Sequence, residues 1–276
     1  MDNVNITFIG CGNMGRSLIG GLIRNGFPAS LVIGADLDKQ KLELAVEQFG
    51  IETSNDNAHA VKDADVIVLA VKPQAIKETL LELQDQLAKS RPLLVSIAAG
   101  IRLTDITKWS GGKIAVVRVM PNTPALVNSG AAALCSNPFT SPVQREIAEM
   151  VMRSVGITIW VQDEKLMNAV TALSGSGPAY FFYFMELIEK GAVDLGLSNK
   201  QARLLTLETA LGAAKMALES EHDLQELRKH VTSPGGTTEA ALRVLEKGKL
   251  EALISKAMRA ACERSEELGR MFGDKT

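Results

Sequence analysis

The amino-acid sequence predicts an α/β protein with a doubly wound, mostly parallel sheet, followed by an all-helical region. Three observations support this prediction. Strand and helix patterns alternate from residue 4 to about residue 162, as expected of a sheet covered by helices on both faces. A glycine-rich turn follows the first strand pattern and opens the first helix pattern. After Trp160 only helical patterns remain. We therefore expect one domain over residues 1–162 and a second, helical domain over residues 163–276.

The expected strands are short runs rich in apolar and β-branched residues. ADVIVLAV at residues 64–71 is almost continuously apolar, which is typical of a strand buried on both faces. The other expected strands are VNITFI (4–9), LVIGAD (31–36), PLLVSIAAG (92–100), KIAVVRVMP (113–121), AAALCSN (131–137) and GITIWV (156–161).

Helices are expected between these strands, over residues 13–26, 39–50, 73–90 and 142–154. Pro73 stands at a first helical position, where its missing N–H costs nothing. Ser141 and Gln144 have the spacing of a capping box at the start of the last of these helices.

The second half predicts one or two helices over residues 163–196 and further helices over 202–220 and 223–231. A capping box at residues 198–201 precedes the second of these, and a final helix runs from about Glu239 to about Phe272, with a break near EKGKLE. The run Tyr180–Met185 is apolar all round, so we expect it to be buried on several sides. A dimer with exchanged helices would bury this surface.

Composition and charge exclude several classes of protein. The net charge is -2 and no basic face is evident, so nucleic acid is not an expected partner. The apolar runs are shorter than the ~20 residues that span a bilayer. The three cysteines and three histidines are scattered along the chain, so we expect neither a disulfide framework nor a metal site. We expect a cytoplasmic protein.

The turn GCGNMG places Gly10, Gly12 and Gly15 at the spacing of a dinucleotide-binding fingerprint. Gly10 permits a tight turn, Gly12 lets the backbone approach a pyrophosphate, and Gly15 lets helix and strand pack closely. A tight turn without a ligand is the alternative. The position of the turn at the start of a strand–helix unit favours a Rossmann-type cofactor site.

Asp36 lies 21 residues past Gly15, where an acid binds the ribose 2′-hydroxyl of NAD and repels the 2′-phosphate of NADP. Two alternatives stay open: Asp36 caps the following helix, or Asp38 takes either role. Lys39 and Lys41 are close enough in the sequence to weaken the repulsion. We expect the cofactor to be NADPH or NADH, with a slight preference for NADH.

Three further strand ends carry Pro, Gly or small residues: AVKPQ (70–74), SIAAG (96–100) and VMPNTPALV (119–127). Lys72 is either a general acid tuned by burial or a solvated lysine at a helix start, and we favour the second interpretation. In SGSGPAY, Gly175 and Gly177 allow close approach of a cofactor or of a neighbouring helix.

The segment TSPGGTT at residues 232–238 interrupts the helical half. It is either a linker or a place where backbone amides are exposed for a ligand. Its residues Gly235 to Thr238 open a helix, and the free N–H groups and dipole of a helix N-terminus attract a carboxylate. We favour an anion pocket.

The motifs FIGCGNMG, AVKP, SIAAG, MPNTPALV, ALSGSGPAY and SPGGTT, in this order, resemble those of pyrroline-5-carboxylate reductase. The resemblance extends from Ile6 to about Leu268, and the later motifs are more specific than the glycine fingerprint. It implies reduction of 1-pyrroline-5-carboxylate to L-proline, the last step of proline biosynthesis, by hydride transfer from NAD(P)H. It also implies a helical dimerisation domain with the active site at the dimer interface, and many family members assemble such dimers into decamers.

Matching motif by motif, the resemblance implies two sets of binding residues. The cofactor would contact Ile9, Gly10, Cys11, Gly12, Asn13, Met14, Asn57, Ala70, Val71, Lys72, Pro73, Ile97, Ala98 and Ala99, with Asp36 joining them from its spacing. The substrate would contact Ser233, Gly235, Gly236, Thr237 and Thr238. Thr238 matches the family threonine that hydrogen-bonds the ring nitrogen, so we expect it to orient the imine and assign it as the catalytic residue.

The chain departs from the family pattern at two places. Ala35–Asp36 replaces a pair in many relatives that suits a 2′-phosphate, and His230 replaces an asparagine found in some relatives. Two other functions remain open at this stage. A β-hydroxyacid-dehydrogenase-like reductase would need a lysine acid/base on the helix after the small-residue motif, where only Lys190 occurs, at the far end. A non-enzymatic NAD(P)-sensing protein would bind the cofactor without turnover.

Overall fold

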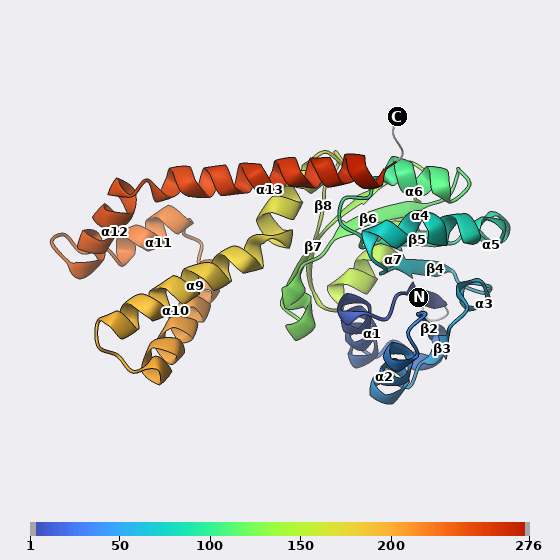
Figure 1. Ribbon diagram of the computed structural model, residues 1–276, viewed down its shortest axis with the longest axis horizontal. Helices are drawn as coiled ribbons and strands as arrows, with labels where there is room; N and C mark the ends of the chain where they lie inside the picture. Colours follow the sequence, from blue (N-terminus) through green and yellow to red (C-terminus); the bar gives the residue numbers. More distant parts are fainter. Residues whose placement is uncertain (1–3, 274–276) are drawn as a thin grey trace. The chain divides into compact units, whose positions relative to one another are not determined.

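The computed structural model describes residues 4–273, which form two compact units (Figure 1). The first unit contains the described residues up to Ser176 together with those from Ala260 onward, and the second contains Gly177–Arg259. The expected domain boundary between residues 162 and 163 stays a prediction.

The first unit is built on one sheet with the strand order β3-β2-β1-β4-β5-β6-β7-β8. Every neighbouring pair is parallel except β6 and β7, which confirms the mostly parallel, doubly wound sheet. The strands are β1 (Ile6–Ile9), β2 (Val32–Ala35), β3 (Glu52–Ser54), β4 (Val66–Leu69), β5 (Leu93–Ser96), β6 (Val116–Met120), β7 (Gly130–Ser136) and β8 (Gly156–Trp160).

Helices cover both faces of this sheet because successive strand residues point to opposite sides. In β4, Val66 and Val68 belong to one buried cluster and Ile67 and Leu69 to another. The first cluster includes residues of α1 (Asn13–Arg24), α2 (Lys39–Phe49) and α7 (Pro142–Arg153). The second includes residues of α4 (Pro73–Glu82), α5 (Gln84–Ser90), α6 (Leu103–Trp109) and α8 (Leu166–Val170), together with Val61 and Ala64, which follow α3 (Asn57–Ala60).

Local signals in the sequence predicted most of these elements, with a few differences. The Ser141 capping box is confirmed: its hydroxyl accepts from the Gln144 N–H at 3.2 Å, and the Gln144 side chain accepts in return. The helix expected over residues 73–90 is two helices that meet at Leu83. Five short elements were not predicted, because they are too short to show a periodic pattern. They are β3, α3, α6 and the two 3₁₀ turns η1 (Ala29–Leu31) and η2 (Thr123–Val127).

The second unit is helical, and its element bounds follow the predicted breaks. It contains α9 (Gly177–Asp194), α10 (Asn199–Glu219), α11 (Leu224–His230), α12 (Thr237–Lys247) and the first part of α13 (Leu250–Phe272). The expected break near EKGKLE is confirmed, since α12 ends at Lys247 and α13 begins at Leu250. No helix in the described part of the chain is long and apolar enough to cross a membrane.

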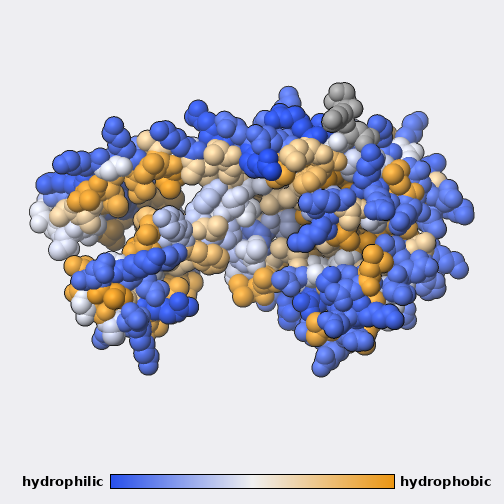
Figure 2. All heavy atoms as spheres, viewed as in Figure 1, coloured by the Kyte–Doolittle hydropathy of each residue, from blue (hydrophilic) through white to orange (hydrophobic). Residues whose placement is uncertain are grey.

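The apolar run in α9 lacks a covering layer within this single chain. Phe181, Phe182 and Tyr183 are 71%, 63% and 61% exposed, so the burial expected on several sides is not reached here. Figure 2 shows apolar residues gathered over the helices of this unit. A large exposed apolar surface is a usual mark of an interface, and a second copy of the helical unit would supply the missing contacts.

Candidate functional site: the carboxyl ends of the strands and the loop before α12

The first unit brings its predicted cofactor residues to one edge of the sheet. Ile9 pairs with Ala35 on one side and with Leu69 on the other, so β1, β2 and β4 end at the same level. The ladder continues one residue further: the Gly10 N–H donates to Ala35 O at 2.7 Å, and the Ala70 N–H donates to Ile9 O at 2.8 Å. Loops that bind ligands in such sheets leave from this edge.

The glycine turn leaves room for a ligand at one position only. Gly10 has φ +106°, and a Cβ there would lie 2.7 Å from the backbone of Ala70, so a larger residue is excluded. A Cβ on Gly15 would meet the Gly10 carbonyl oxygen. By contrast, a Cβ on Gly12 would meet nothing within 4 Å. Gly10 and Gly15 are therefore explained by packing, and Gly12 borders open space.

The start of α1 fits an anionic group. Gly12 is the N-cap residue, it forms no side-chain capping bond, and the first turn of the helix contains no acidic residue. The first N–H groups of a helix have no intrahelical partner, and they attract phosphate. The open space beside Gly12 and this uncapped helix end together suit a pyrophosphate.

Asp36 joins the turn after β2 to the glycine turn. Its Oδ2 accepts from the Cys11 N–H at 2.9 Å, and its Oδ1 accepts from the Asp38 N–H at 3.0 Å. Lys41 Nζ lies 3.4 Å from Oδ1 and 3.6 Å from Asp38 Oδ2. The N-cap residue of α2 is Asp38, whose Oδ1 accepts from the Gln40 N–H. Of the two aspartates that could cap this helix, it is therefore Asp38 that does so. Asp36 is free of that role, but protein donors already engage it.

Cys11 lies in the fingerprint but is fully buried, and its Sγ lies 3.8 Å from Ala35 O. Burial, with a smaller contribution from the Asp36 carboxylate, raises the pKa of the Cys11 thiol to about 12. The thiol is therefore protonated at neutral pH, and a nucleophilic role is excluded. Cys11 contributes its backbone N–H to the Asp36 bond and its side chain to packing.

The other expected cofactor residues follow β3, β4 and β5. Asn57 is the first residue of α3, Ala70–Pro73 lead from β4 into α4, and Ile97–Ala99 follow β5. The Ile97 N–H donates to Leu69 O at 3.1 Å, which places this segment at the same edge as Gly10. Lys72 is exposed at the N-cap of α4, in agreement with the favoured interpretation as a solvated lysine.

The small-residue motif after β8 packs against the loop after β6. A Cβ on Gly175 would meet the Met120 side chain, and Asn122 Nδ2 donates to Ser174 Oγ at 3.2 Å. Asn122 Oδ1 also accepts from the Ala131 N–H at 2.9 Å. The close approach at Gly175 is therefore made by a protein side chain. Sequence reasoning missed the Asn122 contacts, because the only local signal is a polar residue between two prolines.

The predicted substrate residues lie in the second unit, in the loop that joins α11 to α12. Gly235 has φ +72°, the Gly236 N–H donates to Ser233 O at 3.0 Å, and α12 begins at Thr237. Gly236 is the N-cap residue and forms no side-chain capping bond, so the first N–H groups of α12 are open to a ligand. Thr238 is half-buried, and no side chain or carbonyl among the described residues engages its hydroxyl.

His230 closes α11 just before this loop. Its ring lies edge-on to that of His222, with the centroids 4.9 Å apart. His222 Nδ1 lies 3.2 Å from Glu226 Oε2. The His230 ring therefore packs against a residue of the turn that precedes α11.

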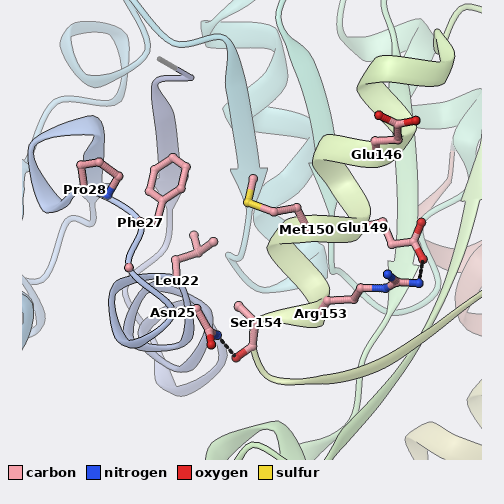
Figure 3. Close-up of a pocket in the computed structure, with 10 residues that line it drawn as sticks. Leu22, Asn25, Phe27, Pro28, Glu146, Glu149, Met150, Arg153 and Ser154 are labelled. Carbon is pink, nitrogen blue, oxygen red and sulfur yellow. Dashed lines mark hydrogen bonds and ion pairs between the residues drawn. The ribbon is translucent and has the colours of Figure 1, made fainter. Parts of the chain in front are cut away.

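A cavity of about 830 Å³ lies elsewhere in the first unit, between the end of α1 and α7 (Figure 3). Asn25 Nδ2 donates to Ser154 O at 3.1 Å on its wall, and Arg153 pairs with Glu149 at 2.8 Å. This cavity is at the C-terminal end of α1, one helix length from the glycine turn. Because cofactors bind at the carboxyl ends of the strands in such sheets, it is not the expected cofactor site.

Comparison with protein families identifies both parts of the chain. Residues 5–100 match the family model described as NADP oxidoreductase coenzyme F420-dependent. Residues 164–268 match the model described as pyrroline-5-carboxylate reductase dimerisation.

Named relatives and solved structures match over nearly the full length. A pyrroline-5-carboxylate reductase from Pseudomonas aeruginosa is 48% identical and covers 99% of this chain and 100% of its own. One from Arabidopsis thaliana is 38% identical, with 98% and 97% covered. The solved enzyme from Coxiella burnetii is 46% identical, with a TM-score of 0.93 and 96% and 98% covered.

A second solved structure, a pyrroline carboxylate reductase from Plasmodium falciparum with NADP bound, is 31% identical with a TM-score of 0.87. It covers 98% of this chain and 99% of its own. With these full-length relatives and with the fold and loops described above, the chain belongs to the pyrroline-5-carboxylate reductase family.

Proposed function

We propose that this protein reduces 1-pyrroline-5-carboxylate to L-proline with a hydride from NADPH or NADH, the last step of proline biosynthesis. The observation that carries the proposal is the full-length similarity to enzymes of this name, 48% in one relative. The site geometry supports it, because one unit carries an uncapped helix beside open space at Gly12 and the other carries an uncapped helix at Thr237.

The cofactor would be held along the edge of the sheet by Ile9–Met14, Asp36, Asn57, Ala70–Pro73 and Ile97–Ala99. Bound there, it supplies the hydride for the imine carbon. The N–H groups at the start of α1 would bind its pyrophosphate next to Gly12. The fixed strand ends would keep these loops in place without reorganisation, which favours a productive orientation.

The substrate would be held by Ser233 and by Gly235–Thr238. Its carboxylate fits the open N–H groups at the start of α12, where the helix dipole favours a negative charge. The Thr238 hydroxyl would donate a hydrogen bond to the ring nitrogen. If the imine binds protonated, the hydride converts C=N–H⁺ directly to the amine. If it binds neutral, water supplies the proton that the nitrogen needs as the carbon gains the hydride, because a threonine hydroxyl is too weak an acid.

The two alternatives find less support. A β-hydroxyacid-dehydrogenase-like enzyme needs a lysine acid/base early in the helix after the small-residue motif, but the only lysine in α9 is Lys190. Lys190 is exposed and pairs with Glu186 at 2.6 Å, and this hydrogen bond raises the pKa of its ammonium group. It is therefore a cation at neutral pH and a poor base. A non-enzymatic NAD(P)-binding protein would bind the cofactor but catalyse no turnover, so an activity assay distinguishes it from both enzymes.

Self-association is supported by the match to a dimerisation model and by the exposed apolar residues of α9. We propose a homodimer in which a second copy covers these residues. Assembly of dimers into a decamer and a location in the cytoplasm stay predictions from the sequence and its resemblance.

The proposed function is tested by following NADPH and NADH oxidation with and without 1-pyrroline-5-carboxylate. We expect oxidation only when the imine is present, with L-proline as the product. Oxidation with a β-hydroxyacid partner substrate instead would favour the first alternative. Cofactor binding without turnover would favour the second.

Replacing Thr238 by Ala should leave the fold intact and lower kcat/KM for the imine by roughly 100-fold, the lower end of the effect of removing one preorganised donor. Thr238→Ser keeps the hydroxyl and should retain most of the activity. Steady-state kinetics with a melting curve for each variant provide the check. Wild-type kcat/KM in a folded Thr238→Ala protein would remove Thr238 from the mechanism.

Replacing Gly12 or Gly15 by Val should have different effects: the first on cofactor binding and the second on the stability of the fold. Gly12→Val should keep the melting temperature and weaken NADPH binding, because its side chain enters only the open space where a pyrophosphate would lie. Gly15→Val should destabilise the fold by about 1–3 kcal/mol or more, because its side chain meets the Gly10 carbonyl. Thermal melts and cofactor titration measure the two effects, and unchanged NADPH affinity in Gly12→Val would contradict the assignment.

The preference between the two cofactors depends on how the Asp36 charge is offset. A carboxylate has about four lone pairs, and three protein donors approach Asp36, so one position stays free for a ribose hydroxyl. The same charge would repel a 2′-phosphate, but the Lys41 ammonium group lies beside it. We propose that Lys41 permits NADPH to bind despite Asp36.

Lys41→Gln should therefore lower kcat/KM for NADPH relative to NADH by about 5-fold, the effect of one partly screened charge. Lys39→Gln is the matched control. It removes the same charge two residues earlier in the chain, and the Lys39 side chain forms no hydrogen bond or ion pair among the described residues. Kinetics with both cofactors at low and high salt give the ratio. An unchanged ratio in Lys41→Gln, or an equal change in Lys39→Gln, would contradict this role.

A further inference from the structure

The loop before α12 is fixed by an acidic side chain that the proposed mechanism does not use. Glu239 is the third residue of α12, and its Oε2 accepts a hydrogen bond from the Gly235 N–H at 2.9 Å. Gly235 is the loop residue with a positive φ, +72°. Glycine adopts such φ angles more readily than other residues because it has no Cβ, and it is also the residue with the most flexible backbone. The Glu239 bond therefore holds the loop at the point where its backbone is freest.

The same carboxylate places a negative charge beside the expected anion site. It occupies the Gly235 N–H, which leaves the N–H groups at the start of α12, those of Thr237 and Thr238, for a substrate carboxylate. A bound anion would be repelled by Glu239 across a short distance. The interaction is worth most at low ionic strength, since the side chain of Glu239 is 33% exposed.

Arg243 offsets this charge from the next turn of the helix. Its Nη2 lies 3.2 Å from Oε2 of Glu239, the same oxygen that accepts from Gly235. An arginine four residues after a glutamate lies on the same helix face. One carboxylate oxygen is therefore shared between the backbone of the loop and a cation of the helix.

Building on the proposed function, we propose that Glu239 is a positioning residue for the substrate loop and that Arg243 neutralises it. Glu239 keeps the Ser233–Thr238 loop in its reactive shape through the Gly235 bond. Its charge opposes the substrate carboxylate, and Arg243 limits that opposition. Geometry and charge are thus separable effects at one side chain, because a glutamine can accept the Gly235 bond without carrying a charge.

Three variants separate the two effects. Glu239→Gln should keep kcat within about 2-fold and lower KM for the imine by about 2- to 5-fold, a difference that shrinks in high salt. Glu239→Ala should lower kcat by about 10-fold, because the loop loses its tether and the reacting groups their alignment. Arg243→Gln should raise KM by about 2- to 5-fold at unchanged kcat, because the Glu239 charge is then uncompensated.

Glu246→Gln is the matched control, since it removes an exposed acid from the same helix two turns further on, and its kcat and KM should equal those of the wild type.

Amide hydrogen exchange without substrate gives an independent readout. Exchange over residues 233–238 should be faster in Glu239→Ala and unchanged in Glu239→Gln. Turnover by the wild-type protein tests the proposed function. Hydrogen exchange tests the Glu239–Gly235 bond, and it does so even if the wild-type protein shows no turnover. Glu239→Ala with wild-type kcat and exchange, or Glu239→Gln behaving like Glu239→Ala, would overturn the proposal.

Discussion

The hydrogen-bond register that joins β1 to β2 and β4 is the constraint on which the first unit depends. Because Ile9 lies level with Ala35 and Leu69, the residues that follow these strands start their turns from one line. Gly10 fits against Ala70 only without a side chain, and α1 can begin where it does only because Gly15 leaves space for the Gly10 carbonyl. A slip of one residue would turn every buried strand side chain to the opposite face and separate the loops.

Asp36 shows how a residue can serve structure and specificity together. Its carboxylate ties the turn after β2 to the glycine turn through the Cys11 N–H, while one acceptor position stays free. A carboxylate at this position favours a ribose hydroxyl over a phosphate, and the neighbouring Lys41 moderates that effect. Glu239 repeats the arrangement in the helical unit, where a carboxylate holds a loop backbone and an adjacent cation offsets its charge.

Local patterns in the sequence were sufficient for much of this account. Apolar runs and glycine spacing predicted the parallel sheet and the turn at residues 10–15, and the capping box at Ser141 predicted a helix start that the structure confirms. Short elements such as Glu52–Ser54 form by pairing with a neighbour, Glu52 opposite Ile33, which no local pattern reports. The Asp36–Cys11 bond joins residues 25 apart, and the Asn122–Ser174 bond residues 52 apart, so both depend on the completed fold. The roles of the site residues stay predictions that the geometry supports.

The central claim is that the edge of the sheet binds the cofactor and that the open amides of α12 bind the substrate carboxylate. Amide hydrogen exchange on the wild-type protein, with NADP⁺ alone and with NADP⁺ plus L-proline, tests it most directly. The account predicts that NADP⁺ slows exchange over residues 10–15, and that added proline slows exchange at Thr237 and Thr238. Protection by proline that leaves residues 233–238 unchanged would contradict it.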